Sequence, residues 1–244
     1  MVLFKSKKLS ILKRLKVNKD NYIVAASKPW SIQAYYEFCE DLPNWYLVKH
    51  KEEMTLEFIE SINPRYIFFP HWNWIVPSNI ISKYESVCFH MTDVPYGRGG
   101  SPLQNLIIRG HKETKLTALK MTDDLDAGPV YLKDNLSLYG SAQDIFTRAA
   151  GQIMELAFTI SETNPAPKKQ IGEATIFKRR RPSDSEVQEK MSIEQLYDFI
   201  RMLDADTYPK AFISSKGYRF EFDKANLCPA GNLSARVTIT DINK

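Results

Sequence analysis

Apolar and polar positions follow one another along the chain in blocks typical of strands and helices. Short apolar runs predict strands at 22–26, 45–48, 66–70, 87–89 and 116–121, and the first has the unbroken apolar pattern of a strand buried on both faces. Between them, 27–31 predicts a turn that leads into a helix through about Cys39, and helical spacing or turn signals predict helices over 52–61 and 103–109. This alternation is typical of right-handed crossovers in a parallel sheet. The predicted fold class is therefore α/β, with a Rossmann-like, mostly parallel sheet and flanking helices.

The last third of the chain has a different pattern. An amphipathic helix is predicted over 140–161, and Asn164-Pro165-Ala166-Pro167 then predicts a linker. A strand at 175–181 and a helix over 191–203 follow, and alternation across 212–241 predicts a small antiparallel β-rich subdomain. We expect a Rossmann-like domain over 21–165 that carries the candidate site, and a linker, helix and β-subdomain over 166–244.

Residues 1–20 form a third predicted part, a basic amphipathic helix. We expect it to pack on the main domain with its lysines in water, while contact with a membrane surface or nucleic acid stays open.

Composition excludes several classes of protein. The net charge of +4 is mild, and Pro, Asn or Lys interrupts the longest apolar runs, so no membrane span is predicted. Cys39, Cys88 and Cys228 are widely spaced and lack metal-type pairing, which predicts free thiols, no metal site and a cytoplasmic location. The turn after the first strand has no glycines, which argues against a dinucleotide cofactor such as NAD or FAD.

Chemically capable side chains follow the predicted strand ends. His90 comes directly after the run at 87–89, and Asp123, Asp124 and Asp126 crowd the loop after the run at 116–121. Ligands of parallel sheets bind beyond the carboxyl ends of the strands. We therefore expect His90 and Asp126 to share one solvent-reachable pocket.

At these residues the chain resembles the folate-dependent formyltransferases. The order His-x-x-x-x-Pro-x-x-Arg-Gly, a helix begun by proline and then Leu-Asp-Ala-Gly-Pro carries the resemblance, through His90, Pro95, Arg98, Gly99, Pro102, Leu125, Asp126, Gly128 and Pro129. The segments 180–186 and 200–212 look like those of sugar-modifying members. The resemblance implies an N-formyltransferase that uses 10-formyltetrahydrofolate and no metal. Its implied acceptor is the amine of a nucleotide-linked amino sugar, in a bacterial surface-glycan pathway such as pseudaminic-acid-type biosynthesis.

Formyl transfer passes through a tetrahedral intermediate, so it needs a proton acceptor, an oxyanion donor and a proton source. The resemblance assigns His90 as the acid/base and oxyanion partner, and Asp126 as the group that holds its protonation state and geometry. Family members usually have an asparagine two residues before this histidine, where this chain has Cys88, a weak hydrogen-bond partner. Asn73 is the candidate for supplying the amide from elsewhere.

The remaining candidate residues are assigned to binding. For the folate they are Phe69, Pro70, Asp123, Asp124 and Leu125, and for the acceptor they are Arg98, Gly99, Arg180 and Arg181. Two alternatives stay open. Arg98 either orients the acceptor or locks the turn, and Arg179, Arg180 and Arg181 either bind a phosphate or form an exposed basic turn.

Other functions remain to be separated from this one. The alternative enzyme is a methionyl-tRNA formyltransferase-like protein. Such proteins carry a larger C-terminal domain for tRNA, and a tRNA partner would favour a net charge more positive than +4. We therefore expect no nucleic-acid partner. A third possibility is a homologue that binds a nucleotide sugar or folate without catalysis, and Cys88 in place of the usual asparagine favours it. A free glycinamide nucleotide is a further possible acceptor, and an exposed edge of the β-subdomain makes a homodimer plausible.

Overall fold

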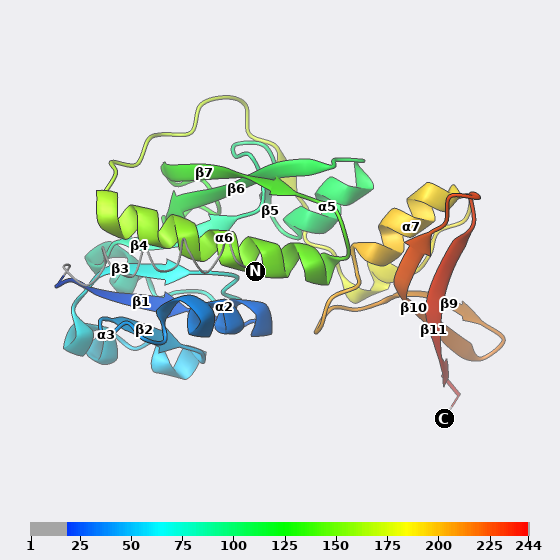
Figure 1. The fold of residues 1–244 in the computed structure, drawn as a ribbon, viewed down its shortest axis with the longest axis horizontal. Coiled ribbons are helices and arrows are strands. Elements are labelled where there is room, and N and C mark those ends of the chain that lie inside the picture. Colours follow the sequence, from blue (N-terminus) through cyan, green and yellow to red (C-terminus); the bar gives the residue numbers. More distant parts are fainter. Residues whose placement is uncertain (1–18, 244) are drawn as a thin grey trace.

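The computed structural model describes residues 19–243, and Figure 1 shows their arrangement. A six-stranded sheet lies at its centre, in the order β2-β1-β3-β4-β6-β7. The first four strands along the chain are parallel: β1 (Asn21–Ala25), β2 (Trp45–Val48), β3 (Pro64–Phe69) and β4 (Ser86–His90). β6 (Glu113–Lys120) and β7 (Val130–Ser137) are each antiparallel to the preceding strand in the order. The α/β fold class with a mostly parallel sheet is confirmed.

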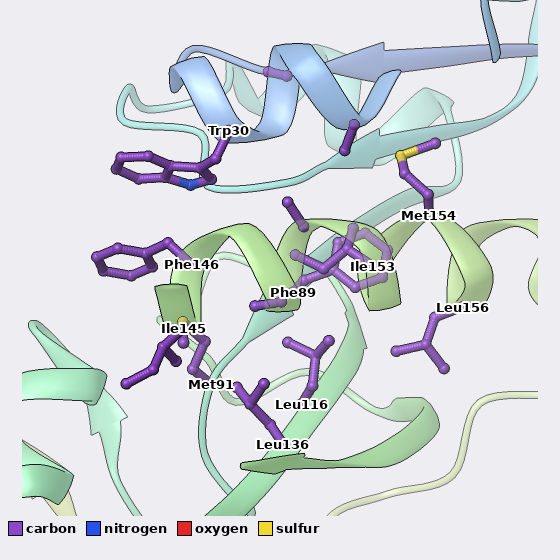
Figure 2. Packing of buried hydrophobic residues seen from close by; sticks show 14 of the residues in the cluster. Trp30, Phe89, Met91, Leu116, Leu136, Ile145, Phe146, Ile153, Met154 and Leu156 are labelled. Atoms are coloured by element: carbon purple, nitrogen blue, oxygen red, sulfur yellow. The ribbon is translucent and has the colours of Figure 1, made fainter. Parts of the chain in front are cut away.

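Helices cover both faces of this sheet. α2 (Pro29–Cys39) and α6 (Ala142–Thr163) pack together on one face, where Trp30 stacks on Phe146 with ring centroids 4.8 Å apart (Figure 2). α3 (Leu56–Ile62) and α4 (Ser78–Lys83) contribute apolar residues to a separate core cluster with alternate residues of β1 and β3. Tyr22 and Val24 belong to the first cluster and Ile23 to the second, all with 0% exposure. This burial on both faces explains the unbroken apolar pattern of β1.

Capping side chains fix where two helices begin. Thr55 Oγ1 accepts a hydrogen bond from Phe58 N at 3.2 Å, so α3 begins at Leu56, later than predicted, after a short 3-10 turn at Lys51–Glu53. At α6, Ser141 and Asp144 form a reciprocal capping box, which places the helix start at Ala142.

The strand predicted over 175–181 is much shorter in the structure. Only β8 (Ile176–Phe177) forms, paired in parallel with β5 (Arg98–Gly99). Gly100 N also donates to Phe177 O at 3.0 Å. The following residues, Lys178 to Arg181, are polar and have no strand partner in the described sheets, so the pairing ends there. β8 thus ties the segment after α6 to the glycine turn that precedes α5 (Pro102–Ile108).

A second sheet follows at one end of the large one (Figure 1). It is antiparallel, in the order β11-β10-β9, from β9 (Ala211–Ser215), β10 (Tyr218–Leu227) and β11 (Leu233–Asp241). α7 (Ile193–Arg201) packs on β10 and also contacts α5. The predicted C-terminal antiparallel sheet is confirmed.

The predicted N-terminal helix and the predicted lack of a membrane span depend on which residues the structure describes. The helix predicted for residues 1–20 falls outside the described residues, apart from Lys19 and Asp20. Within 19–243, no helix combines the length and the apolar character needed to cross a membrane.

Candidate active site

A large cavity lies where β3 and β4 end. Its volume is about 920 Å³, within the range of small-molecule pockets. Its walls come from the loop after β3, the glycine turn before α5, the loop between β6 and β7, and β8 with Arg179. The cavity therefore opens at the carboxyl ends of parallel strands, the edge at which α/β sheets bind their ligands.

His90 and Asp126 meet in this cavity. His90 is the last residue of β4, and its Nδ1 lies 3.5 Å from Asp126 Oδ2. Both side chains line the cavity and are largely buried, at 8% and 12% exposure. Asp126 Oδ2 also accepts a hydrogen bond from Gly99 N at 2.9 Å. The pocket shared by His90 and Asp126, expected from the sequence, is present in the structure.

The second ring nitrogen of His90 has a backbone partner. Nε2 lies 2.8 Å from Gly97 O, and a carbonyl oxygen only accepts hydrogen bonds, so Nε2 carries a proton. In the neutral ring, the free lone pair is therefore on Nδ1, on the side of Asp126. A proton taken up at Nδ1 faces the carboxylate, which stabilises the charged ring. This arrangement makes Nδ1 the atom of His90 that can exchange a proton.

The loop that carries Asp126 folds back on the sheet. β6 is antiparallel to β4, with Lys120 opposite Val87, so β6 ends at the beginning of β4 and not beside His90. The loop must therefore extend back toward the end of β4 to place Asp126 against His90. Gln170 Nε2 supports this path by donating to the carbonyls of Asp126 and Gly128, at 2.9 and 2.8 Å.

Arg98 also contacts Gln170. Its Nε and Nη2 donate to Gln170 Oε1 at 3.1 and 2.8 Å, and Arg98 does not line the cavity. Arg98 and Gln170 thus connect the glycine turn to the loop of Asp126. Of the two roles left open by the sequence, this geometry supports locking the turn. The neighbouring Gly99 lines the cavity and holds Asp126 through its backbone.

Cys88 and Asn73 lie on different walls of the cavity. Burial, together with the nearby Asp126 carboxylate, raises the pKa of the Cys88 thiol to about 12. The thiol therefore stays protonated at neutral pH, which makes it a poor nucleophile. Asn73 is exposed on the loop after β3. Its assignment as the amide donor remains a prediction.

The predicted folate-binding residues separate into two groups. Phe69, Asp123, Asp124 and Leu125 line the cavity, whereas Pro70 is buried and does not. Beside Phe69, the wall is formed by apolar side chains, among them Trp72, Leu119 and Met121. Trp72 Nε1 is buried and has no hydrogen-bond partner among the described residues. A flat ring with hydrogen-bond acceptors fits such a wall, because it would supply the missing partner.

The arginine run is divided in the same way. Arg179 lines the cavity, whereas Arg180 and Arg181 do not. Arg180 packs its guanidinium 5.5 Å from the Phe199 ring centroid and donates to Asp184 O, and burial lowers its pKa. Arg181 is exposed in the turn that follows. Binding of the acceptor by Arg180 and Arg181 stays a prediction, and Arg179 is the arginine of the run that the structure brings to the cavity.

Gln170, which contacts the loop of Asp126, and His71, which lines the cavity, were not assigned from the sequence. Gln170 lies in the loop after α6, where no pattern marks a residue that bonds to positions more than 40 residues earlier. His71 follows β3, and its position after a strand end was the available signal. His71 lines the cavity, and its Nδ1 lies 3.1 Å from the indole Nε1 of Trp30.

Comparisons with known proteins point to one family. A domain family described as "Methionyl-tRNA formyltransferase, C-terminal domain" matches residues 182–240. The solved structure of a methionyl-tRNA formyltransferase from Clostridium thermocellum is 43% identical, with a TM-score of 0.87, and the match covers 91% of this chain and 99% of that one. A methionyl-tRNA formyltransferase of Thermodesulfovibrio yellowstonii is 25% identical over 66% of this chain. The chain spans about half the length of that relative, since the match covers 54% of it.

More distant solved structures share the fold. A 4-N formyltransferase from Francisella tularensis is 12% identical, with a TM-score of 0.62, over 89% of this chain and 96% of that one. HypX from Aquifex aeolicus, solved with tetrahydrofolic acid, is 16% identical, with a TM-score of 0.69, over 85% of this chain and 38% of that one.

Proposed function

Because the chain belongs to the formyltransferase family, we propose that it transfers a formyl group from 10-formyltetrahydrofolate to a primary amine. The observation that carries this proposal is the His90–Asp126 pair in the large cavity, 3.5 Å apart and joined to the backbone of the glycine turn. Tetrahydrofolic acid is the ligand of HypX, a protein of the same fold.

The residues of this chain would act on the amine and its proton. The bound folate supplies the formyl group on nitrogen. His90 accepts the proton of the attacking amine at Nδ1, the ring atom with the free lone pair, and returns it to the nitrogen that leaves. Asp126 stabilises the charged ring and keeps it oriented. Phe69, Trp72 and the loop of Asp123 to Leu125 would hold the pterin and keep water from the reacting atoms.

Methionyl-tRNA is the acceptor that the named relatives favour. Both the C-terminal family match at 182–240 and the relative at 43% identity carry the name methionyl-tRNA formyltransferase. This support is stronger than the support for the amino sugar expected from the sequence. A methionyl-tRNA substrate would present its amine at the end of a long polyanion, so its binding should weaken steeply as salt increases.

A nucleotide-linked amino sugar is the second candidate, and the charge of the C-terminal region favours it. Residues 182–240 contain nine acidic and seven basic side chains, so this region is not a basic surface. Four of the seven basic side chains are ion-paired with carboxylates of the same region: Arg201, Lys210, Arg219 and Arg236. Few cations are left there for a nucleic-acid backbone.

A turnover assay tests the proposed reaction. Purified protein is mixed with 10-formyltetrahydrofolate and either methionyl-tRNA or a panel of nucleotide-linked amino sugars, and release of tetrahydrofolate is followed. We expect Asp126→Asn to lower kcat by about 10²-fold or more, because the carboxylate no longer stabilises the protonated His90. Glu162→Gln, an exposed change at the end of α6, is the matched control and should leave kcat within about twofold. Equal turnover in Asp126→Asn and wild type would contradict the proposal.

A further inference from the structure

Three of the nine non-glycine residues with positive φ in the described part of the chain line the cavity. His71, Ser101 and Asp126 have positive φ values of 53, 50 and 52°, and all three line the cavity. Thr207, in the loop before β9, has φ of 67°, which is unfavourable for a β-branched residue. Residues held in such conformations cluster at ligand-binding sites. Thr207 takes no part in the proposed formyl transfer, so its strain calls for another explanation.

Lys28 lies against Thr207. Its Nζ donates to Thr207 Oγ1 at 3.1 Å and lies 5.5 Å from the Tyr208 ring centroid and 5.8 Å from that of Trp30. Within residues 19–243, no carboxylate forms an ion pair with Lys28, and burial lowers its pKa. Because Thr207 Oγ1 accepts from Lys28, its own proton remains available to a third group. A partly buried cation without a carboxylate is costly unless an anion binds beside it.

Arg179 approaches the same place from another segment. It is exposed, lines the cavity beside Gly100, and acts electrostatically on Tyr208. No ion pair to Arg179 is present among the described residues. Two cations without a carboxylate partner among the described residues, Lys28 before α2 and Arg179 after β8, therefore both act on Tyr208, and Arg179 also lines the cavity.

His71 lines the cavity and lies near Lys28. The indole N–H of Trp30 only donates, so Nδ1 of His71 accepts and Nε2 carries the proton in the neutral ring. Nε2 is buried and has no hydrogen-bond partner in the described part of the chain. Burial and the nearby Lys28 lower the pKa of His71 to about 4. The ring is therefore neutral near pH 7 and offers one unused N–H donor.

We propose that Lys28, Arg179 and Thr207 form a subsite beside the cavity that binds the diphosphate of a nucleoside-diphosphate-linked amine. Two cations match the two negative charges of a diphosphate ester, and guanidinium and hydroxyl donors suit phosphate oxygens. A short site of this kind fits a small nucleotide better than a long polyanion, which needs many phosphate contacts. This inference rests on the proposed formyl transfer and selects its acceptor class.

Calorimetric titration tests the subsite without depending on turnover. UDP, GDP, CDP, dTDP, inorganic pyrophosphate and unacylated tRNA are each titrated into the full chain. We expect at least one nucleoside diphosphate to bind, and both Arg179→Gln and Lys28→Met to raise its Kd about tenfold or more. Absence of binding by all four nucleoside diphosphates would overturn the inference, as would an unchanged Kd in both variants. Binding of tRNA alone would overturn it in favour of the polyanion.

Matched controls isolate the subsite. Lys178→Gln is the control for Arg179→Gln, because it removes an exposed positive charge next to Arg179 and outside the cavity wall. Lys169→Met is the control for Lys28→Met, because Lys169 is also exposed and outside the cavity wall. Both should leave the Kd within about twofold. If Lys28→Met fails to fold, the Kd measured for the exposed Arg179→Gln variant tests the subsite by itself. Titration with 5-formyltetrahydrofolate separates the two proposals. If the wild-type chain does not bind this folate, the proposed function is contradicted. If it binds the folate but no nucleoside diphosphate, only the subsite is contradicted.

Discussion

At the scale of single residues, surroundings decide what each side chain can do. Cys88 is in the position where family members usually have an asparagine, and it lines the cavity that contains His90. A thiol there could act as a nucleophile only as the thiolate. Burial and the carboxylate of Asp126 both oppose that form and raise the pKa of Cys88 to about 12.

This pKa predicts a slow reaction of Cys88 with iodoacetamide. At pH 8.5 a thiol with a pKa of about 12 is ionised to well under 1%, whereas about half of an ordinary free thiol is ionised. We expect Cys88 to be alkylated at least about 10²-fold more slowly than the same cysteine in the denatured chain, as measured by peptide mass spectrometry. Similar rates in the folded and denatured chains would show that the thiolate is accessible.

At the scale of elements, Gly128 allows the loop between β6 and β7 to pass close to the backbone of β6. A Cβ on Gly128 would lie only 1.8 Å from the carbonyl oxygen of Lys120. The backbone after Asp126 can therefore pass β6 only without a side chain at this position. Gly151, inside α6, has no atom within 4 Å of the place its Cβ would occupy.

Two alanine substitutions should thus have opposite effects. Gly128→Ala forces apart two backbone segments and should lower the free energy of unfolding by more than about 2 kcal/mol. Gly151→Ala should raise it by about 0.5–1 kcal/mol, because glycine is unfavourable inside a helix. Urea unfolding of both variants measures the difference. A tolerated Gly128→Ala would mean that the loop does not pass β6 as closely as described.

The sequence predicted most elements because each is long enough to show a hydrophobic period. β1 and β2 were predicted to within one residue of the observed bounds, whereas α2 begins at Pro29, inside the predicted turn at 27–31. The pairing of β5 with β8 could not be predicted, since two residues are too few to show a period. Of the candidate site, His90 and Asp126 were predicted through the family motif, whereas Lys28 and Thr207 of the proposed subsite are 179 residues apart and belong to no recognised pattern.

At the scale of the whole molecule, burial of His71 links stability to pH. The pKa of His71 is about 4 in the folded chain, against 6.5 for an ordinary histidine. Between these values the unfolded chain binds a proton that the folded chain does not, so stability increases with pH in this window. The contribution is fully present above about pH 6.5 and is lost as the pH falls toward 4.

Denaturant unfolding from pH 7 to pH 4 should show this loss, which is about 3 kcal/mol for one histidine with such a shift. His71→Gln cannot take up the proton, so its stability should depend less on pH over the same range. Subtracting the two curves removes contributions from the carboxylates shared by both proteins. Parallel curves for wild type and His71→Gln would show that His71 is protonated equally in the folded and unfolded chains.

The short pairing of β5 with β8 has a mechanical consequence. On its way from α6 to α7, the chain adds a strand to the same turn whose Gly97 and Gly99 backbone groups hold His90 and Asp126. A displacement of the C-terminal sheet would therefore reach Gly97 O and Gly99 N, the backbone atoms that contact His90 and Asp126. An acceptor that bound both sheets would therefore act on the alignment of His90 and Asp126, the proposed proton-transferring pair, and would couple its own binding to reactivity.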